Sequence, residues 1–122
     1  MRGGVGVKSK EVGTRGEDFA VRYLTARGYR IHSRNFRCRL GEIDIVAEEQ
    51  GKLVFVEVKT RHGDRYGLPQ EAVTPAKQER LRRLAQYYLS VKRITDRPCR
   101  FDVLALTIGG DEIKPVLIRG AF

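Results

Sequence analysis

The segment 41–60 places two carboxylates and a lysine inside otherwise apolar, β-branched stretches of sequence. The stretches 42–47 and 53–60 predict two β-strands, and the polar residues 48–52 predict a tight hairpin connection between them. Charged side chains within such strands are costly to bury unless a cation accompanies them. This hairpin therefore constrains both the fold and the chemistry of the chain.

The register of the hairpin decides which charges meet. If Glu48 pairs with Leu53, Asp44 lies directly opposite Glu57. Side chains alternate between the two faces of a strand. One face then carries Asp44, Val46, Leu53, Phe55, Glu57 and Lys59, and the other carries Ile43, Ile45, Ala47, Val54, Val56 and Val58. Because both faces are mostly apolar, we expect helices or other segments to cover both sides of the sheet.

Two opposed carboxylates in this register repel each other. Directly opposed residues lie roughly 5 Å apart, and like charges at that distance repel by about 3 kcal/mol at an effective dielectric near 20. Lys59 is one candidate for the compensating cation, and a divalent metal between Asp44 and Glu57 is the other. Hard oxygen ligands favour Mg²⁺ or Mn²⁺ over zinc. A buried Asp/Glu/Lys network without chemistry is the alternative.

The set Asp44, Glu57 and Lys59 resembles the D…ExK signature of the PD-(D/E)xK nuclease superfamily. The segments 41–47 and 54–61 also resemble the YraN-type family of small bacterial proteins, which is similar to archaeal Holliday junction resolvases. The resemblance extends over about residues 14–106, although no proline precedes Asp44. Further matching residues are Gly16, Glu17, Ala20, Tyr23, Leu24, Gly28, Tyr29, Arg34, Asn35, Tyr66, Gly67, Pro69, Glu71, Ala72, Val73, Lys77, Arg80, Arg100, Phe101, Asp102 and Val103.

The resemblance implies a single nuclease-like domain over 1–122, of the α/β class, with a restriction-endonuclease-like mixed β-sheet flanked by helices. It also implies metal-dependent cleavage of DNA, with branched or distorted DNA as the favoured substrate. Asp44, Glu57 and the backbone carbonyl of Val58 are then the expected ligands of Mg²⁺ or Mn²⁺. Lys59 is expected to orient the attacking water or stabilise the transition state, and Glu17 to hold a second metal or the water.

The charge balance points to the same class of partner. Lys and Arg number 24 against 15 Asp and Glu, which gives a formal net charge of +9 and a pI near 10.0. Such an excess is typical of proteins that bind polyanions, and nucleic acid is the partner we expect. The alternative is a basic protein whose charges serve only solubility. The candidate phosphate-binding residues are Arg34, Arg37, Arg61, Lys77 and Arg80.

Hydrophobic periodicity predicts the order helix, three strands, helix, two strands. The first helix is expected from Thr14, or from as early as Ser9, to Arg27, after a flexible basic tail over 1–10. The second begins with Thr74 as N-cap and Pro75 in its first turn. The predicted ranges are strands 30–37, 42–47 and 53–60, a substrate-facing loop 61–69, a helix to Val91, and strands 100–107 and 113–119. The strand after the second helix should run parallel to the strand that carries Glu57.

Other features limit the alternatives. Cys38 and Cys99 form no CxxC pair, so we expect free thiols and a cytoplasmic protein without a membrane span. A non-catalytic nucleic-acid-binding module on a nuclease-like fold is the second functional hypothesis, and a structural partner of a larger repair or uptake machine is the third. The sequence leaves the oligomeric state open, a homodimer included.

Overall fold

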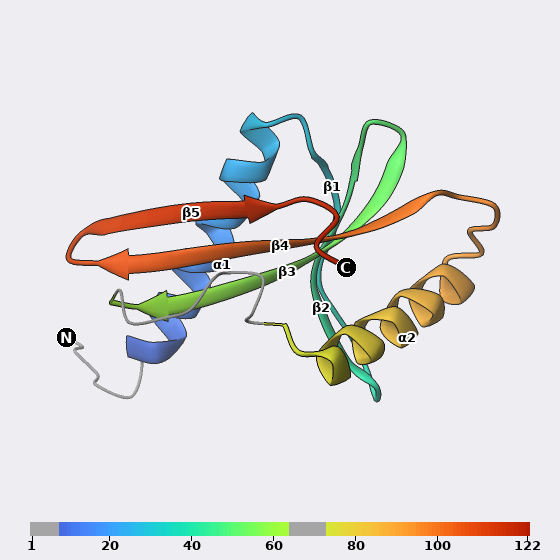
Figure 1. Cartoon of the computed structure of the whole chain (residues 1–122), viewed down its shortest axis with the longest axis horizontal. Coiled ribbons are helices and arrows are strands. Elements are labelled where there is room, and N and C mark those ends of the chain that lie inside the picture. The colour runs from blue at the N-terminus through green and yellow to red at the C-terminus, as the bar shows by residue number, and fades with distance from the viewer. Residues whose placement is uncertain (1–7, 64–72) are drawn as a thin grey trace.

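The computed structural model of this protein describes residues 8–63 and 73–122, with side chains from residue 16 onward. Two helices and five strands follow one another in the predicted order (Figure 1). The elements are α1 Lys8–Ala26, β1 Arg30–Cys38, β2 Gly41–Glu49, β3 Lys52–His62, α2 Pro75–Val91, β4 Cys99–Gly109 and β5 Glu112–Ile118. No helix in these described ranges is long and apolar enough to cross a membrane.

The strands form one mixed sheet in the order β1-β2-β3-β4-β5. Neighbouring strands are antiparallel except for β3 and β4, which are parallel and connected through α2. Both the parallel pairing and the hairpin register with Glu48 opposite Leu53 confirm the sequence predictions. The α/β class with a nuclease-like arrangement of elements is therefore confirmed.

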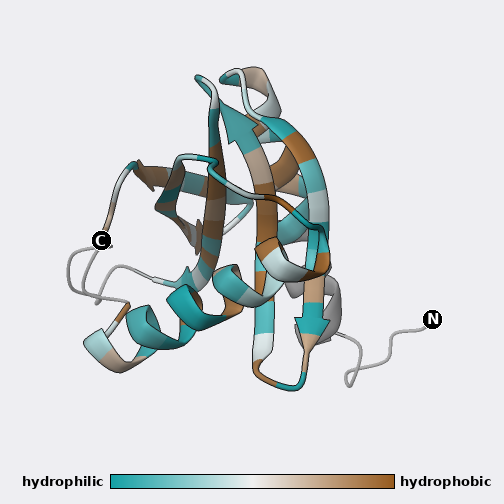
Figure 2. Ribbon diagram, turned by 90° about the vertical axis from the view of Figure 1, so that its right-hand side faces the viewer, coloured by the Kyte–Doolittle hydropathy of each residue, from teal (hydrophilic) through white to brown (hydrophobic). Residues whose placement is uncertain are grey.

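The two helices cover opposite faces of the sheet, as the mostly apolar strands require. Ala20 and Leu24 of α1 pack against one face, in a cluster that includes Val56 and Leu104. The apolar side of α2 packs against the other face through Leu81, Leu84, Ala85 and Tyr88. Figure 2 shows hydrophobic residues banding the strands, whereas α2 is hydrophilic over most of its visible surface. Each helix therefore buries one stripe and leaves its polar side in water.

One predicted side-chain direction is wrong. Ile43 packs in the same cluster as Val46 on the α2 side, three residues away, whereas strict alternation placed it with Ile45. The alternation breaks at Asp44, which lies in register with Asn35 between regular pairs on either side. Asn35 has a positive φ of 54°, so β1 is distorted at the same level. The two strands therefore kink together at the position of the candidate site.

The ends of the helices agree only in part with the sequence predictions. Thr74 is the N-cap of α2, and its hydroxyl accepts a hydrogen bond from the Lys77 backbone N–H at 3.2 Å. By contrast, α1 begins at Lys8, so Thr14 lies inside the helix and residues 8–10 of the predicted tail are helical. The alternative start at Ser9 lies one residue from the observed one, and the start at Thr14 is wrong because local capping signals only weakly determine helix ends. Residues 1–7 of the tail, and 64–69 of the predicted loop, lie outside the described residues.

A buried polar network fastens β4 to the segment after α1. The fully buried Asp102 carboxylate accepts hydrogen bonds from the Tyr29 hydroxyl at 2.7 Å and from Arg100 Nε at 2.9 Å. It also accepts from the Gly120 backbone N–H at 2.9 Å, which ties down the C-terminal segment. Burial, together with the hydrogen bond to Asp102, raises the pKa of Tyr29 to about 12. Arg100 also donates to Glu49 at 2.9 Å, so the network joins the ends of β2 and β4.

We expect Asp102→Ala to lower the free energy of unfolding by about 3–5 kcal/mol, because it leaves the nearly buried Arg100 guanidinium without its main partner. Tyr29→Phe removes one hydrogen bond and should cost about 1 kcal/mol. Urea unfolding followed by circular dichroism measures both values. An Asp102→Ala loss no larger than that of Tyr29→Phe would contradict the structural role assigned to this network.

Candidate active site

The hairpin brings Asp44 and Glu57 to the same level of neighbouring strands. The regular pairing of β2 with β3 ends at Ile45 and Val56, one step before these carboxylates. Instead of continuing the ladder, the Val58 backbone N–H donates a hydrogen bond to Asp44 Oδ2 at 2.8 Å. The side chain of Asp44 thus takes a position that a main-chain carbonyl would otherwise occupy. The local distortion of β2 is what points this carboxylate at β3.

Glu57 is nearly buried and has a cation beside it. Its side chain is 10% exposed, and its Oε2 lies 2.9 Å from Nζ of Lys77, in the first turn of α2. The sequence offered Lys59 as the internal cation, but Lys59 is exposed and makes no ion pair within the described residues. Lys77 takes that role because α2 packs over the face that carries Glu57. Lys59 lies two residues further along β3, which by the alternation of a regular strand is the face of Glu57.

The carboxylates of Glu17 and Glu42 also lie near Asp44. We call Glu17, Glu42, Asp44 and Glu57 the acidic cluster. Asn35, at the kink of β1, lies between Glu17 and Glu42. With its amide nitrogen turned toward the carboxylates, it donates to Glu42 Oε2 at 2.6 Å and to Glu17 Oε2 at 3.2 Å. The α1 residue Glu17 therefore reaches the sheet, as the sequence predicted from its place at the margin of the apolar stripe.

The acidic cluster changes the protonation of Asp44. Burial and the negative charge of Glu57 are the two largest causes that raise the pKa of Asp44, to about 7. The charges of Glu42 and Glu17 add to the rise, and the hydrogen bond from the Val58 N–H opposes it. The neighbouring carboxylates therefore disfavour the ionised form of Asp44.

The donor set at this site fits a hard cation. Asp44 and Glu57 offer carboxylate oxygens whose mutual repulsion a divalent ion would relieve. Within the described residues, however, no three Asp, Glu, His or Cys side chains already converge as a coordination set. Mg²⁺ does not require such a set, because it keeps several waters and is commonly held by one or two carboxylates. Asp44, Glu57 and the carbonyl of Val58 are therefore sufficient in kind to hold Mg²⁺ or Mn²⁺.

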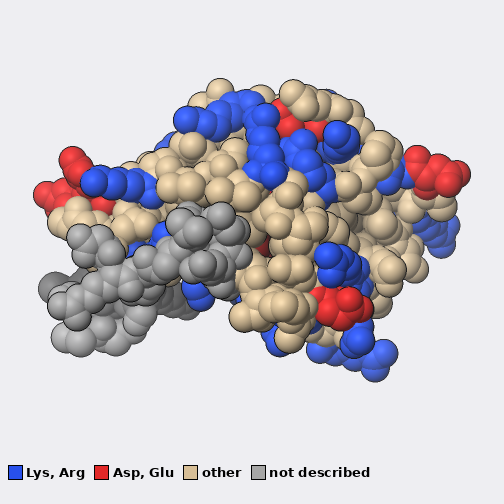
Figure 3. Space-filling view, viewed as in Figure 1, with Lys and Arg blue, Asp and Glu red and all other residues tan. Residues whose placement is uncertain are grey.

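The basic residues predicted to bind phosphates have different surroundings. Arg34 is engaged with Asp18 at 2.9 Å, and Arg37 lies 3.5 Å from Glu42. Arg61 donates to the Thr107 hydroxyl at 3.5 Å, on the strand face that carries Glu57. Arg80 is exposed on α2. On the face shown in Figure 3, Lys and Arg form a band near the upper edge of the molecule, while Asp and Glu occur in smaller groups.

Sequence reasoning missed two members of this site and one contact. Asn35 was matched only as part of the family resemblance, and Glu42 received no role. Lys77 was predicted to meet a phosphate, not to pair with Glu57. The signal for Asn35 and Glu42 was weak, since their meeting with Glu17 depends on the kink of β1 and on how α1 lies beside it.

Comparison with known proteins places the chain in a family. The model of the family described as "Uncharacterised protein family UPF0102" matches residues 16–106. This chain belongs to the UPF0102 family. A UPF0102 protein of Symbiobacterium thermophilum is 55% identical over 115 residues, which are 93% of this chain and 98% of that protein. A UPF0102 protein of Lachnoclostridium phytofermentans is 50% identical over 117 residues, covering 95% of this chain and 96% of its own.

The region that identifies this UPF0102 protein is also the region that builds the site. Residues 16–106 contain Glu17, Asp44, Glu57, Lys59 and Lys77. A UPF0102 protein of Syntrophus aciditrophicus is 47% identical over 110 residues, or 90% of this chain and 87% of that protein. Neither the family description nor the names of these relatives state an activity.

The raised pKa of Asp44 predicts a specific dependence of stability on pH. Between the ordinary aspartate pKa of 3.8 and about 7, the folded protein binds more protons than the unfolded chain. The free energy of unfolding contributed by Asp44 is therefore largest below pH 4 and is lost as the pH rises through 7. In EDTA, Asp44→Asn should gain stability relative to wild type across this window.

Urea unfolding at a series of pH values measures this difference. Asp111→Asn, in the exposed β4–β5 turn, is the matched control for removing a carboxylate. A difference between Asp44→Asn and wild type that stays constant from pH 4 to pH 8 would show that Asp44 is not electrostatically strained.

Proposed function

We propose that this UPF0102 protein is a metal-dependent nuclease that hydrolyses phosphodiesters in DNA, with branched or distorted DNA as its preferred substrate. The observation that carries the proposal is the acidic cluster around Asp44, with Lys77 paired to Glu57 and Lys59 two residues along the same strand. The preference for DNA rests on the resemblance to the PD-(D/E)xK nucleases and junction resolvases. The formal net charge of +9 supports a polyanionic substrate.

In this proposal the chain supplies ligands, a cation and a water-positioning group. Asp44, Glu57 and the Val58 carbonyl would hold Mg²⁺ or Mn²⁺. When bound, such an ion supplies Lewis-acid stabilisation of the phosphate charge and lowers the pKa of a coordinated water. Lys59, exposed on the same strand face as Glu57, would stabilise the negative charge that develops on the phosphate. Glu17, oriented by Asn35, would accept a hydrogen bond from the attacking water.

Lys77 has a place in the same proposal. In the described structure its ammonium compensates the charge of Glu57 at 2.9 Å. A divalent ion at Glu57 would take over that compensation and release Lys77 toward the substrate phosphate. The sequence-based assignment of Lys77 to phosphate binding and its observed pairing with Glu57 would then describe two states of one residue.

The acidic cluster favours catalysis over a non-catalytic nucleic-acid-binding module. Carboxylates that face a polyanion weaken its binding unless a cation bridges them. A binding platform gains nothing from Asp44, Glu42 and Glu57 in this position, whereas a metal-dependent nuclease requires such ligands. The non-catalytic module is therefore the second candidate, and it is the reading that remains if no substrate is cleaved.

Millimolar Mg²⁺ or Mn²⁺ should raise the melting temperature of the wild type, because an ion that binds only the folded state stabilises it by mass action, by about 1.4 kcal/mol at ten times the Kd. Asp44→Asn should lose most of this increase. Lys77→Met should melt lower without metal and gain more from metal than the wild type, because Glu57 then has no internal cation.

Differential scanning fluorimetry with and without each ion measures these shifts. Lys52→Met, at the exposed first residue of β3, controls for the loss of a lysine. An identical metal response in wild type, Asp44→Asn and Lys77→Met would remove the support for a metal at this site.

Lys59→Ala should lower the rate of DNA cleavage by about 10²–10³-fold with little change in DNA affinity, because Lys59 acts on charge that develops in the transition state. Glu57→Ala should lose at least as much activity. The assay uses labelled duplex, single-stranded, flapped and four-way-junction DNA with Mg²⁺ or Mn²⁺, and an RNA control. Equal cleavage by the wild type, Lys59→Ala and Glu57→Ala would identify a contaminating nuclease.

A further inference from the structure

The strand face that carries Glu57 continues past α2 toward the far ends of β3, β4 and β5. In the register of these strands, Lys59 lies level with Val116, and Arg61 lies level with Thr107 and Lys114. Lys59 and Lys114 are exposed, and the apolar Val116 is 42% exposed beside them. This face therefore presents positive charge along a line that starts at the acidic cluster.

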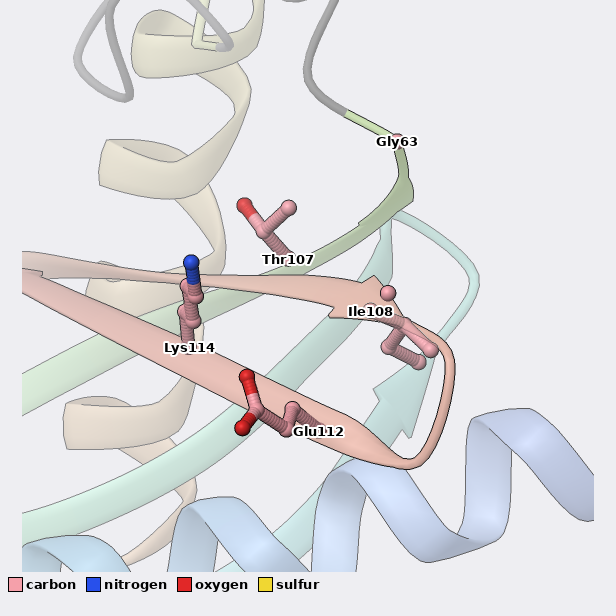
Figure 4. Close-up of a pocket in the computed structure, with 6 residues that line it drawn as sticks. Gly63, Thr107, Ile108, Glu112 and Lys114 are labelled. Atoms are coloured by element: carbon pink, nitrogen blue, oxygen red, sulfur yellow. The ribbon is translucent and has the colours of Figure 1, made fainter.

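A pocket of about 300 Å³ lies at the end of that line, where the parallel strands β3 and β4 end. Its lining residues are Gly63, Thr107, Ile108, Gly109, Glu112 and Lys114. Figure 4 shows Lys114, Thr107 and Glu112 rising from the same face of the β4–β5 pair, away from α1. The pocket is therefore on the same side of the sheet as Glu57.

The pocket is lined by side chains of both charges and by a neutral hydroxyl. Lys114 supplies an ammonium, Thr107 supplies a hydroxyl, and Glu112 supplies a carboxylate. Within the described residues, Glu112 and Lys114 do not form an ion pair with each other, although both belong to β5. A bare anion would be repelled by Glu112. A nucleotide matches both groups, since its phosphate pairs with Lys114 and its base or sugar donors can meet Glu112.

The path from the acidic cluster to the pocket has the length of a short run of nucleotides. Arg61 lies four residues beyond Glu57 on β3, which is about 13 Å at the rise of a β-strand. Phosphates on one strand of DNA are spaced by about 3.4 Å along the helix axis, so 13 Å spans up to about four nucleotides. Lys59 lies at about half that distance and is exposed on the way.

We propose that this pocket binds one unpaired nucleotide of the substrate strand, up to about four nucleotides from the scissile phosphodiester. The distance to the cut rests on the proposed nuclease function; the binding of single-stranded nucleic acid does not. The nucleotide must be unpaired because a base held in a duplex has to leave the stack before it can enter a pocket. The substrate strand then reaches the acidic cluster from a single-stranded region.

The test measures binding of an oligothymidylate of about eight nucleotides, a common length for single-strand sites, in EDTA so that no cleavage occurs. Lys114→Ala and Thr107→Val are compared with the wild type by fluorescence anisotropy at several salt concentrations. Lys52→Ala is the control for losing an exposed lysine, and a blunt duplex is the control ligand. Backbone amide NMR shifts of Thr107 and Gly109 report occupancy of the pocket directly.

We expect Lys114→Ala to bind the oligothymidylate roughly threefold to fivefold more weakly, with the slope of the log-log salt plot reduced by about 0.7. Thr107→Val should show a smaller loss of affinity for the oligothymidylate. Lys52→Ala should show no loss that depends on the pocket. Affinity for the blunt duplex should likewise show no loss that depends on the pocket. In the wild type, the amides of Thr107 and Gly109 should shift when the oligothymidylate is added.

The outcomes separate the pocket from the nuclease. If the wild type cleaves DNA but Lys114→Ala retains wild-type affinity and the amides do not shift, the pocket proposal is wrong and the nuclease stands. If binding depends on Lys114 while the wild type cleaves no substrate, the pocket stands and the nuclease proposal fails. Equal losses for the oligothymidylate and the blunt duplex would also overturn the assignment to an unpaired nucleotide.

Discussion

Repulsion between carboxylates on two neighbouring strands is the constraint around which this protein is organised. Asp44 and Glu57 meet because the β2–β3 hairpin has one register, and neither side chain is fully solvated. The structure offsets their charge with a main-chain N–H from Val58 and with the ammonium of Lys77. The second of these groups belongs to α2, so the electrostatics of the site depend on how this helix packs on the sheet.

The kink shared by β1 and β2 links the fold to the site. In a regular pair of strands, the side chains around Asp44 would alternate strictly between the two faces, and Asn35 opposite it would have an extended backbone. The positive φ of Asn35 and the broken alternation at Asp44 instead bring Asn35 between Glu17 and Glu42. Local irregularities of this kind are common next to functional sites because they re-aim side chains. Here the irregularity brings a donor from β1 together with acceptors from α1 and β2.

The Asp102 network and the acidic cluster differ in how completely their charges are compensated, although Asp102 lies in register with Val56, next to Glu57. Around Asp102, every charge has a partner: Tyr29, Arg100 and Gly120 satisfy its carboxylate, and Glu49 takes a further donor from Arg100. Such a fully bonded network holds strands rigidly in place. The acidic cluster is less completely compensated. Lys77 pairs with Glu57, Arg37 with Glu42 and Arg34 with Glu17, whereas Asp44 has no ion pair within the described residues. A rigidly bonded network therefore lies close to the strained carboxylates of the acidic cluster.

The sequence by itself determined the order of elements, the hairpin register and the placing of Asp44 level with Glu57. Alternating apolar residues and turn formers define strands locally, and the register follows from the tight turn after Glu48, so Asp44, Glu57 and Lys59 could be placed in advance. Contacts between distant segments required the tertiary structure. Which lysine neutralises Glu57 depends on the docking of α2, and the side to which Ile43 points depends on a kink that involves β1 as well as β2. Neither is encoded in a local pattern, because each is the outcome of packing between elements that are far apart in the chain.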